Sequence, residues 1–262
     1  MRHNLQIIPI PAFKDNYIWL IHNHQQAVIV DPGDATPVQE TLQRLQLDLT
    51  TILITHHHHD HIGGVVELQS AYPHARTYAP KREQYQFQHT PVSEGDTVNL
   101  AEFSLQLAVI DLPGHTLGHI AYYIERGSEG DVENLLFCGD TLFGAGCGRL
   151  FEGTPAQMYD SLQKLAALPQ DTKVYCTHEY TMHNIEFAMT LESNNQQLVK
   201  RQQDTIKLRN LQQPSLPSTI GLELATNPFL RCTSPEIQSS VQLPNAPALQ
   251  VFSTIREMRN HY

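Results

Sequence analysis

The sequence predicts an α/β protein with a helical C-terminal part, and two patterns carry this prediction. Up to about residue 178, short apolar runs rich in β-branched residues alternate with stretches of helical periodicity. From Asn184 onward the periodicity is helical and the β signal is weak. With 262 residues, 40% of them hydrophobic, the chain can form one large domain or a medium domain with a small one.

In the first part of the chain, apolar runs predict five strands: 5–10, 16–21, 27–30, 51–54 and 77–79. Helices are expected over 37–47 and 65–72. A turn sequence that begins at Asp31 ends the third strand, and Asp31 fits equally a turn residue and a partner of a metal ligand. A polar turn at 94–96 then leads into a strand over 103–112.

Further along, strands are predicted over 120–124, 134–143 and 172–176. The segment 144–153 contains four glycines and is expected to be a loop with unusual backbone angles. Thr154 and Pro155 predict the start of a helix, as its cap and first residue. The rest of the chain predicts helical structure from 184 to about 211, a break at 214–217, an ordered loop at 227–231 and a terminal helix over 254–262.

The main cluster of candidate metal ligands lies between the strand 51–54 and the helix 65–72, where five histidines and an aspartate occur together. His56 and His58 are two residues apart, so their imidazoles can point the same way, and Asp60 and His61 follow one turn later. Neutral imidazole and carboxylate are the usual ligands of catalytic zinc. A purification tag would lie at a terminus, so the remaining alternatives are a metal site and a solvated polar loop.

Three more candidate ligands follow strands: His115, Asp140 and His178. Asp140 comes after a mostly apolar run, where a carboxylate needs a partner or a metal. We interpret His119 as a packed or hydrogen-bonded histidine and Cys138 as a small buried residue. Seven candidate ligands are too many for one tetrahedral ion, so the set predicts two ions with one bridging carboxylate.

Charge and composition exclude several classes. The net charge is −10, and residues 1–178 contain 10 Lys and Arg against 20 Asp and Glu, which disfavours nucleic-acid binding. No apolar stretch is long enough to span a bilayer, and residues 1–6 show no secretion signal. The four cysteines lack CxxC spacing, which fits reduced thiols. We therefore expect a cytoplasmic protein with no membrane or nucleic-acid partner, and a monomer.

The motif Thr55-His-x-His-x-Asp-His61 resembles the signature of the metallo-β-lactamase superfamily. Three further motifs, at 113–116, 137–141 and 176–181, together with the Gly-Cys-Gly-Arg segment at 146–149, resemble the bacterial glyoxalase II (hydroxyacylglutathione hydrolase) family. The resemblance covers the whole chain. It implies an αβ/βα sandwich of two mixed sheets flanked by helices over residues 1–178, the catalytic domain, and a small helical substrate-binding domain over 179–262.

The resemblance also implies roles for individual residues. His56, His58 and His115 would hold one ion, Asp60, His61 and His178 the other, and Asp140 would bridge them. Asp60 and Asp140 would be the catalytic carboxylates. Glutathione would be bound by Arg149, Tyr180, Arg256 and Arg259, with Phe151 where the family often has tyrosine, which leaves one substrate hydrogen bond in question.

The implied reaction is hydrolysis of S-D-lactoylglutathione to D-lactate and glutathione, the second step of methylglyoxal detoxification, by a hydroxide bound between two divalent metals. Zinc is the expected metal, and iron and manganese accept the same ligands. The alternative is a glutathione persulfide dioxygenase of the same fold with one iron. An exported β-lactamase, a basic tRNA nuclease and a cysteine-rich structural zinc protein fit the sequence less well.

Overall fold

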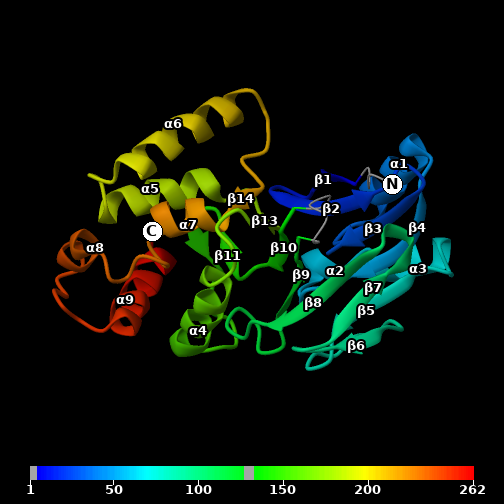
Figure 1. The fold of residues 1–262 in the computed structure, drawn as a ribbon, viewed down its shortest axis with the longest axis horizontal. Coiled ribbons are helices and arrows are strands. Elements are labelled where there is room, and N and C mark those ends of the chain that lie inside the picture. Colours follow the sequence, from blue (N-terminus) through cyan, green and yellow to red (C-terminus); the bar gives the residue numbers. More distant parts are fainter. Residues whose placement is uncertain (1–4, 127–132) are drawn as a thin grey trace. The chain divides into compact units, whose positions relative to one another are not determined.

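The computed structural model of the chain describes residues 5–126 and 133–262 (Figure 1). Residues 1–4, part of the N-terminal segment in which no secretion signal is expected, lie outside the described residues. The chain divides into two compact units: Met1–Asp111 with Thr116–Gly139, and Leu112–His115 with Asp140–Tyr262. The domain boundary predicted after residue 178 falls inside the second unit and stays a prediction.

The first unit contains a mixed six-stranded sheet. Its strands follow the chain order: β1 (Gln6–Ala12), β2 (Asn16–His22), β3 (Gln26–Val30), β4 (Asp48–Leu53), β5 (Arg76–Pro80) and β6 (Thr90–Val92). β1 to β3 pair antiparallel, whereas β3 to β6 pair parallel. Helix α1 (Ala35–Leu45) crosses between β3 and β4, and α2 (His59–Ile62) and α3 (Val65–Ala71) lie between β4 and β5. The carboxyl ends of β3, β4 and β5 therefore meet at one edge of the sheet.

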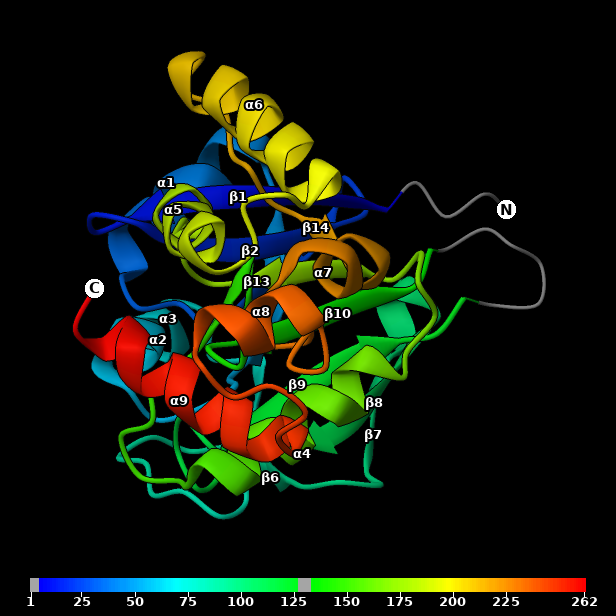
Figure 2. The ribbon, with the colours of Figure 1, turned by 90° about the vertical axis from the view of Figure 1, so that its left-hand side faces the viewer.

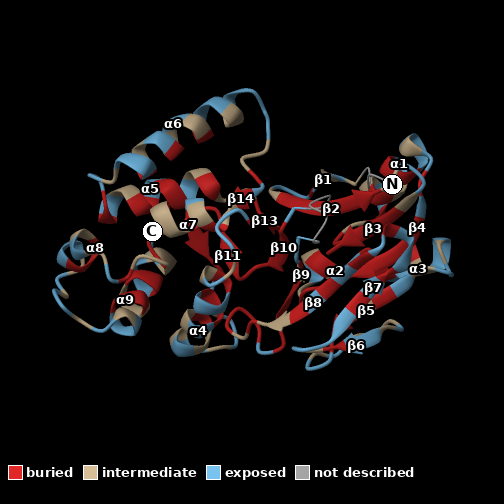
Figure 3. Cartoon of the chain, in the orientation of Figure 1, coloured by how far each residue is buried: buried red, intermediate tan, exposed pale blue. Residues whose placement is uncertain are grey.

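Burial explains why this sheet is stable. All seven residues of β2 are buried, and the strands at the centre of the sheet are mostly buried in Figure 3. Their side chains join those of α1 and α3 in one apolar cluster that includes Leu20, Ile29, Leu42 and Ile52. The apolar face that the sequence predicted for α1 therefore packs in this core.

A second set of strands in the first unit is antiparallel: β7 (Thr97–Leu100), β8 (Leu105–Asp111), β9 (Ile120–Ile124) and β10 (Leu135–Gly139). A short 3₁₀ helix, η1 (Ala101–Phe103), separates β7 from β8. The hydroxyl of Tyr122 donates to the Ile54 carbonyl at 2.9 Å, and the Ile120 amide donates to the Thr55 carbonyl at 2.9 Å. These bonds attach β9 to the chain that follows β4, just before the histidine motif.

The second unit is mainly helical. Its strands form two short antiparallel pairs, β11 (Leu142–Phe143) with β12 (Gly146–Cys147) and β13 (Lys173–Cys176) with β14 (Ser218–Thr219). Its helices are α4 (Pro155–Ala166), α5 (Thr181–Leu191), α6 (Gln196–Asn210), α7 (Ile220–Thr226), α8 (Pro235–Ser240) and α9 (Ala248–Asn260). Helix α9 packs against α4 (Figure 2), and the ring of Phe252 lies edge-on to that of Phe229, 5.8 Å away.

Most predicted elements are present within one to three residues of the expected limits, and Thr154 caps α4 as predicted, with its side chain accepting from the Gln157 amide. The chain from 227 to 231 contains neither helix nor strand, as expected. No helix in residues 5–126 and 133–262 is long and apolar enough to cross a membrane.

The helical structure expected over 184–211 is present as two helices, because the Asn195 side chain accepts from the amides of Gln197 and Leu198 and starts α6 anew. The limits of three other elements differ from those expected. The strand expected over 103–112 begins at Leu105, after η1. The strand expected over 134–143 stops at Gly139, whose φ of 47° ends the extended backbone. The terminal helix begins at Ala248 rather than at residue 254.

Candidate metal centre

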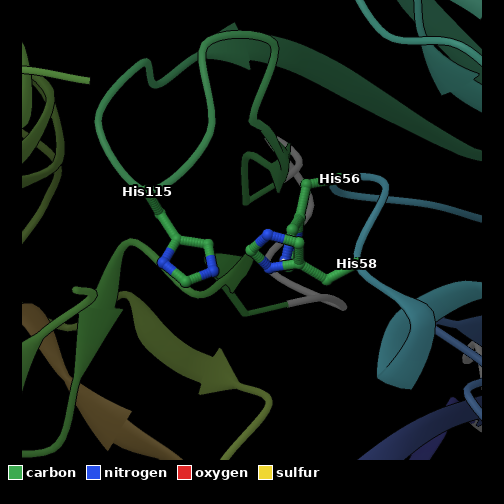
Figure 4. Close-up of side chains that lie close together, drawn as sticks. All are labelled: His56, His58 and His115. Carbon is green, nitrogen blue, oxygen red and sulfur yellow. The ribbon is translucent and has the colours of Figure 1, made fainter. Parts of the chain in front are cut away.

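The four candidate ligands that follow β4 form two pairs, as their spacing predicted. His56 Nε2 lies 3.1 Å from His58 Nδ1, and His61 Nε2 lies 3.6 Å from Asp60 Oδ2. Figure 4 shows the imidazoles of His56 and His58, which come from the loop before α2. His56 and His61 are fully buried, whereas the Asp60 side chain is 42% exposed.

Partners behind these ligands fix their orientation. Asp31, at the end of β3, is buried and accepts from the amide and hydroxyl of Thr55 at 2.8 and 2.7 Å. Its Oδ2 also lies 3.0 Å from His61 Nδ1, so Asp31 is both a turn residue with φ of 53° and a partner of a candidate ligand. Asn16 donates to Asp60 Oδ2 at 3.1 Å. A carboxylate on Nδ1 sets the tautomer that leaves Nε2 available for a metal.

The other three candidate ligands lie in the second unit and converge on one oxygen atom. His115 Nε2 is 3.4 Å and His178 Nε2 is 3.3 Å from Oδ2 of Asp140. His115 Nδ1 lies 2.8 Å from the carbonyl oxygen of Arg149, a bond that orients the ring with Nε2 toward Asp140. His178 stacks on Tyr180 with ring centroids 4.7 Å apart and planes inclined by 2°.

These distances suit ligands of a shared metal. Two ligand atoms that are each about 2.1 Å from a tetrahedral ion lie about 3.4 Å apart, which is longer than an ordinary hydrogen bond. The nitrogen–oxygen distances in the second unit match this spacing. All seven donors are imidazole nitrogens or carboxylate oxygens, which bind zinc, iron and manganese. The residues therefore fit divalent metal ions.

A pocket in the second unit gathers most of the predicted substrate-binding residues. It has a volume of about 210 Å³, and its lining includes Arg149, Tyr180, Arg256 and Arg259. Burial, and then the neighbouring Arg256, lowers the pKa of Arg259 from its ordinary value. Anions should therefore bind here, because they relieve the repulsion between two guanidinium groups.

The two C-terminal arginines have different surroundings. Arg256 is buried, its Nη1 donates to the Cys147 carbonyl at 2.9 Å, and its guanidinium lies 5.2 Å from the centre of the Phe229 ring. Arg259 is half-buried and donates to Oδ1 of Asn184 at 3.1 Å. Arg256 therefore supports the glycine-rich segment as well as lining the pocket.

That segment corrects one prediction. The glycines at 144, 146, 148 and 153 do not have left-handed φ values, whereas Ala145 does, with φ of 54°. Glycine is needed here for close approach: a Cβ on Gly148 would lie 1.9 Å from the carbonyl oxygen of Asp140. A Cβ on Gly144 would lie 2.4 Å from the Thr181 hydroxyl oxygen. The unusual backbone angle expected in this segment is thus at Ala145, whereas the glycines are required by close packing.

Side chains from the helical part hold this segment in place. Asn184 donates to the Gly144 carbonyl at 3.0 Å, and Asn227 donates to the Gly146 carbonyl at 2.9 Å. Glu223, fully buried and paired with Arg201, accepts from the Ala145 amide at 2.8 Å. Each polar backbone group that is buried this way gains a partner, so the C-terminal helices are needed to shape the loop before α4.

The remaining predicted residues lie outside the pocket and the candidate ligand set. Phe151 is 61% exposed and is not among the residues that line the pocket; its ring lies edge-on to that of His115, 5.2 Å away. His119 is buried and stacks on His56 with centroids 4.8 Å apart, and Cys138 is buried as expected. Sequence reasoning missed Asn184 and Tyr262 in the pocket lining, because neither follows a strand.

Comparisons with known proteins agree with the motifs. Residues 13–178 match the model of the metallo-beta-lactamase superfamily, and residues 179–262 match that of the hydroxyacylglutathione hydrolase C-terminus. The chain is 55% identical to hydroxyacylglutathione hydrolase of Methylobacillus flagellatus, over 98% of this chain and 99% of that protein. It is 49% identical to the enzyme of Vibrio parahaemolyticus, over 98% and 100%. The BLEG-1 B3 metallo-beta-lactamase structure aligns with a TM-score of 0.63 at 23% identity, covering 86% of this chain and 99% of that one.

The chain therefore belongs to the metallo-beta-lactamase superfamily and, within it, to the hydroxyacylglutathione hydrolase family. The predicted fold class, two mixed sheets with helices followed by a helical C-terminal part, is confirmed. The groups of histidine and aspartate that could hold a metal ion confirm the expected type of site. The role of each single residue stays a prediction.

Proposed function

We propose that this protein hydrolyses glutathione thioesters of 2-hydroxy acids, with S-D-lactoylglutathione as its main substrate, at a centre of two divalent metal ions. One structural observation carries the metal part of the proposal: Oδ2 of Asp140 lies 3.4 Å from a nitrogen of His115 and 3.3 Å from a nitrogen of His178, and each distance suits two ligands of a common ion. The substrate class is supported by the full-length similarity to hydroxyacylglutathione hydrolases.

In this proposal the seven donors are divided as the family motifs imply. One ion would be held by three histidines, the other by Asp60 and two histidines, and Asp140 would contribute to both. The respective histidines are His56, His58 and His115 for the first ion, and His61 and His178 for the second. Asp31, Thr55 and the Arg149 carbonyl orient three of these rings from behind.

When bound, two divalent ions lower the pKa of water toward neutrality and polarise a carbonyl oxygen. The protein contributes orientation: Asn16 holds Asp60 Oδ2, and the Tyr180 ring supports His178 by stacking. The leaving group of a thioester is a thiolate, whose ordinary pKa of about 8.5 makes a general acid unnecessary. The site therefore needs to place water and the carbonyl carbon, and needs no further proton donor.

The arginine-lined pocket is the proposed binding site for the glutathione part. Its guanidinium groups can meet a carboxylate with paired hydrogen bonds, and the aromatic ring of Tyr180 offers a flat surface. These contacts are remote from the scissile thioester, so they bind substrate and transition state equally. Their loss should raise KM and leave kcat unchanged.

The test is hydrolysis of S-D-lactoylglutathione by purified protein, before and after chelation, with elemental analysis of the loaded protein. We expect two ions per chain, loss of activity on chelation and recovery on adding zinc. Saturation at one ion would contradict the two-ion proposal, and hydrolysis that survives complete metal removal would contradict metal catalysis. Oxygen-dependent turnover of glutathione persulfide without thioesterase activity would favour the dioxygenase alternative.

Zinc is the proposed metal, since imidazole and carboxylate are the usual ligands of catalytic zinc. The ligand set also suits iron and manganese, so the ion that is loaded depends on metal supply. Elemental analysis of protein purified without added metal identifies the ion that the cell loads. A monomeric state and a cytoplasmic location are also proposed, and light scattering and cell fractionation test them.

A further inference from the structure

Glu83 lies in the loop that follows β5, beside the loop of the histidine motif. β4 and β5 are parallel neighbours, and the Ile54 amide donates to the Tyr78 carbonyl at 2.9 Å, so the segments leaving both strands start side by side. The Glu83 side chain is only 3% exposed. A carboxylate at this depth needs several donors to be stable.

Three side chains supply those donors. The Thr116 hydroxyl donates to Oε1 of Glu83, and the Tyr85 hydroxyl donates to Oε2 at 2.8 Å. His57 Nδ1 lies 3.2 Å from Oε1. One carboxylate therefore connects three separate stretches of chain, those around residues 57, 85 and 116.

Two of these stretches carry candidate metal ligands. His57 stands between His56 and His58, and its ring lies 5.1 Å from that of His58 at an angle of 73°. Thr116 directly follows His115 in the chain. Fixing the side chains of residues 57 and 116 limits the backbone freedom of three candidate ligands, although Glu83 is not a ligand itself.

The surroundings of Glu83 are built for this contact. A Cβ on Gly118 would lie 2.3 Å from Cγ of Glu83, so the loop after His115 can approach the carboxylate only with glycine there. The Tyr85 ring packs 4.9 Å from that of Phe87, and both rings pack on the apolar core of the first unit. Burial, and then Glu83, raises the pKa of Tyr85 well above its ordinary value, so its hydroxyl remains a donor.

We propose that Glu83 is a positioning residue of the metal centre: it holds the histidine motif through His57 and the loop after His115 through Thr116. Nothing in the motifs marks it, because it lies more than 20 residues after the histidines. Loss of an outer partner of this kind typically lowers metal affinity about 10- to 100-fold. The inference rests on the proposed metal site.

The main experiment measures zinc affinity of the full chain by competition with a chromophoric chelator. We expect Glu83→Ala to bind zinc about 10- to 100-fold more weakly than wild type. The matched control is Glu102→Ala, which removes a carboxylate of the same unit that pairs with Arg76 at 3.0 Å and contacts no candidate ligand. Affinity in Glu83→Ala equal to that in the control would overturn the proposal.

A second pair of variants covers the case in which Glu83→Ala does not fold. Thr116→Val removes the donor and keeps the shape, whereas Thr116→Ser keeps the hydroxyl. We expect weaker zinc binding in Thr116→Val and near-wild-type binding in Thr116→Ser, with equal melting temperatures of the two metal-free proteins. Equal zinc affinity in the two variants would overturn the role of this contact.

The experiment also separates this inference from the proposed function. If the wild-type chain bound no zinc, the metal site itself would be wrong. If wild type and Glu83→Ala bound two ions with equal affinity, the metal site would stand and the role of Glu83 would fall.

Discussion

The candidate ligands of the two units are arranged in different ways. Those of the first unit lie within six consecutive residues after β4, at positions 56, 58, 60 and 61. Those of the second unit come from three segments, at residues 115, 140 and 178, yet His115 and His178 both approach Asp140. Local spacing is enough to form the first set, whereas the second set depends on long-range packing. The supports differ too: Asp31 orients His61 with a side chain, and a backbone carbonyl orients His115.

The largest expected effect contrasts the two aspartates. Asp140→Ala should lower kcat at least about 100-fold, because the charge stabilisation that it supports is worth several kcal/mol at about 1.4 kcal/mol per tenfold. Asp60→Ala should cost less, since the Asp60 side chain is 42% exposed against 9% for Asp140. Steady-state kinetics with metal analysis of both variants checks this order. Near-wild-type kcat in fully loaded Asp140→Ala would remove Asp140 from its bridging role.

The next contrast is between Asp31, which orients a candidate ligand, and the nearby Asp34, which caps α1. Asp31→Asn keeps the size of the side chain and tolerates its φ of 53°, but it removes the charge that faces His61 and Thr55. We expect zinc affinity to fall about 10-fold or more, measured by chelator competition. Asp34→Asn, at the helix cap a few residues away, is the control and should leave zinc affinity unchanged. Equal affinity in the two variants would argue against Asp31 as a support.

Arg256 should affect stability, in contrast to Arg149. Arg256→Ala leaves the Cys147 carbonyl without its buried charged donor, which should lower the free energy of unfolding by about 2 kcal/mol. In a protein of this size, that corresponds to a melting temperature about 4–8 °C lower in calorimetry. Arg149→Ala, an exposed site, should melt like wild type. An unchanged melting temperature in Arg256→Ala would show that the segment 144–148 does not need this contact.

Arg149→Ala should instead change substrate binding. The His115 bond uses the backbone carbonyl of residue 149, so it survives the substitution and metal content should stay complete. We expect KM for the glutathione thioester to rise several-fold with kcat nearly unchanged, because the proposed contact of this side chain is with the glutathione part and not with the reacting carbonyl. Arg259→Ala should behave likewise. An unchanged KM in Arg149→Ala would exclude this arginine from the binding site.

The smallest effect should come from salt. The pocket arginines attract an anionic substrate in a chain of net charge −10, and salt screens exposed charges over about 10 Å at 0.1 M. Wild-type KM should therefore rise roughly twofold or more between low and high ionic strength. In Arg149→Ala the rise should be smaller. A wild-type KM independent of salt would indicate that charge contributes little to substrate binding.

The strand positions were largely predictable because each strand has a local pattern of apolar and β-branched residues. The alternation and β-branched content of 16–21, 27–30 and 120–124 correspond to β2, β3 and β9. Helical structure over 184–211 was predicted from its periodicity, and the structure divides it into α5 and α6. The point of division was not predicted, because it depends on the Asn195 side chain, which caps α6 by accepting from the amides of Gln197 and Leu198.

The sequence by itself determined the chemical type of the site. His56 and His58 are two residues apart after a strand, so their imidazoles can point the same way, and Asp60 and His61 follow one turn later. These two pairs could therefore be predicted from local spacing. The type of ligand also follows from residue identity alone, since all seven candidates carry imidazole or carboxylate groups.

Tertiary structure decided which distant residues meet. The approach of His115 and His178 to Asp140, the place of Asp31 behind His61, and the contacts of Glu83 with His57 and Thr116 join residues 25 to 38 positions apart in the chain. The glycines of 144–148 are likewise required by backbone atoms and side chains that arrive from elsewhere, such as the hydroxyl of Thr181. Such contacts are set by the path of parallel strands and helices packed by burial, and residue spacing along the chain carries no record of that path.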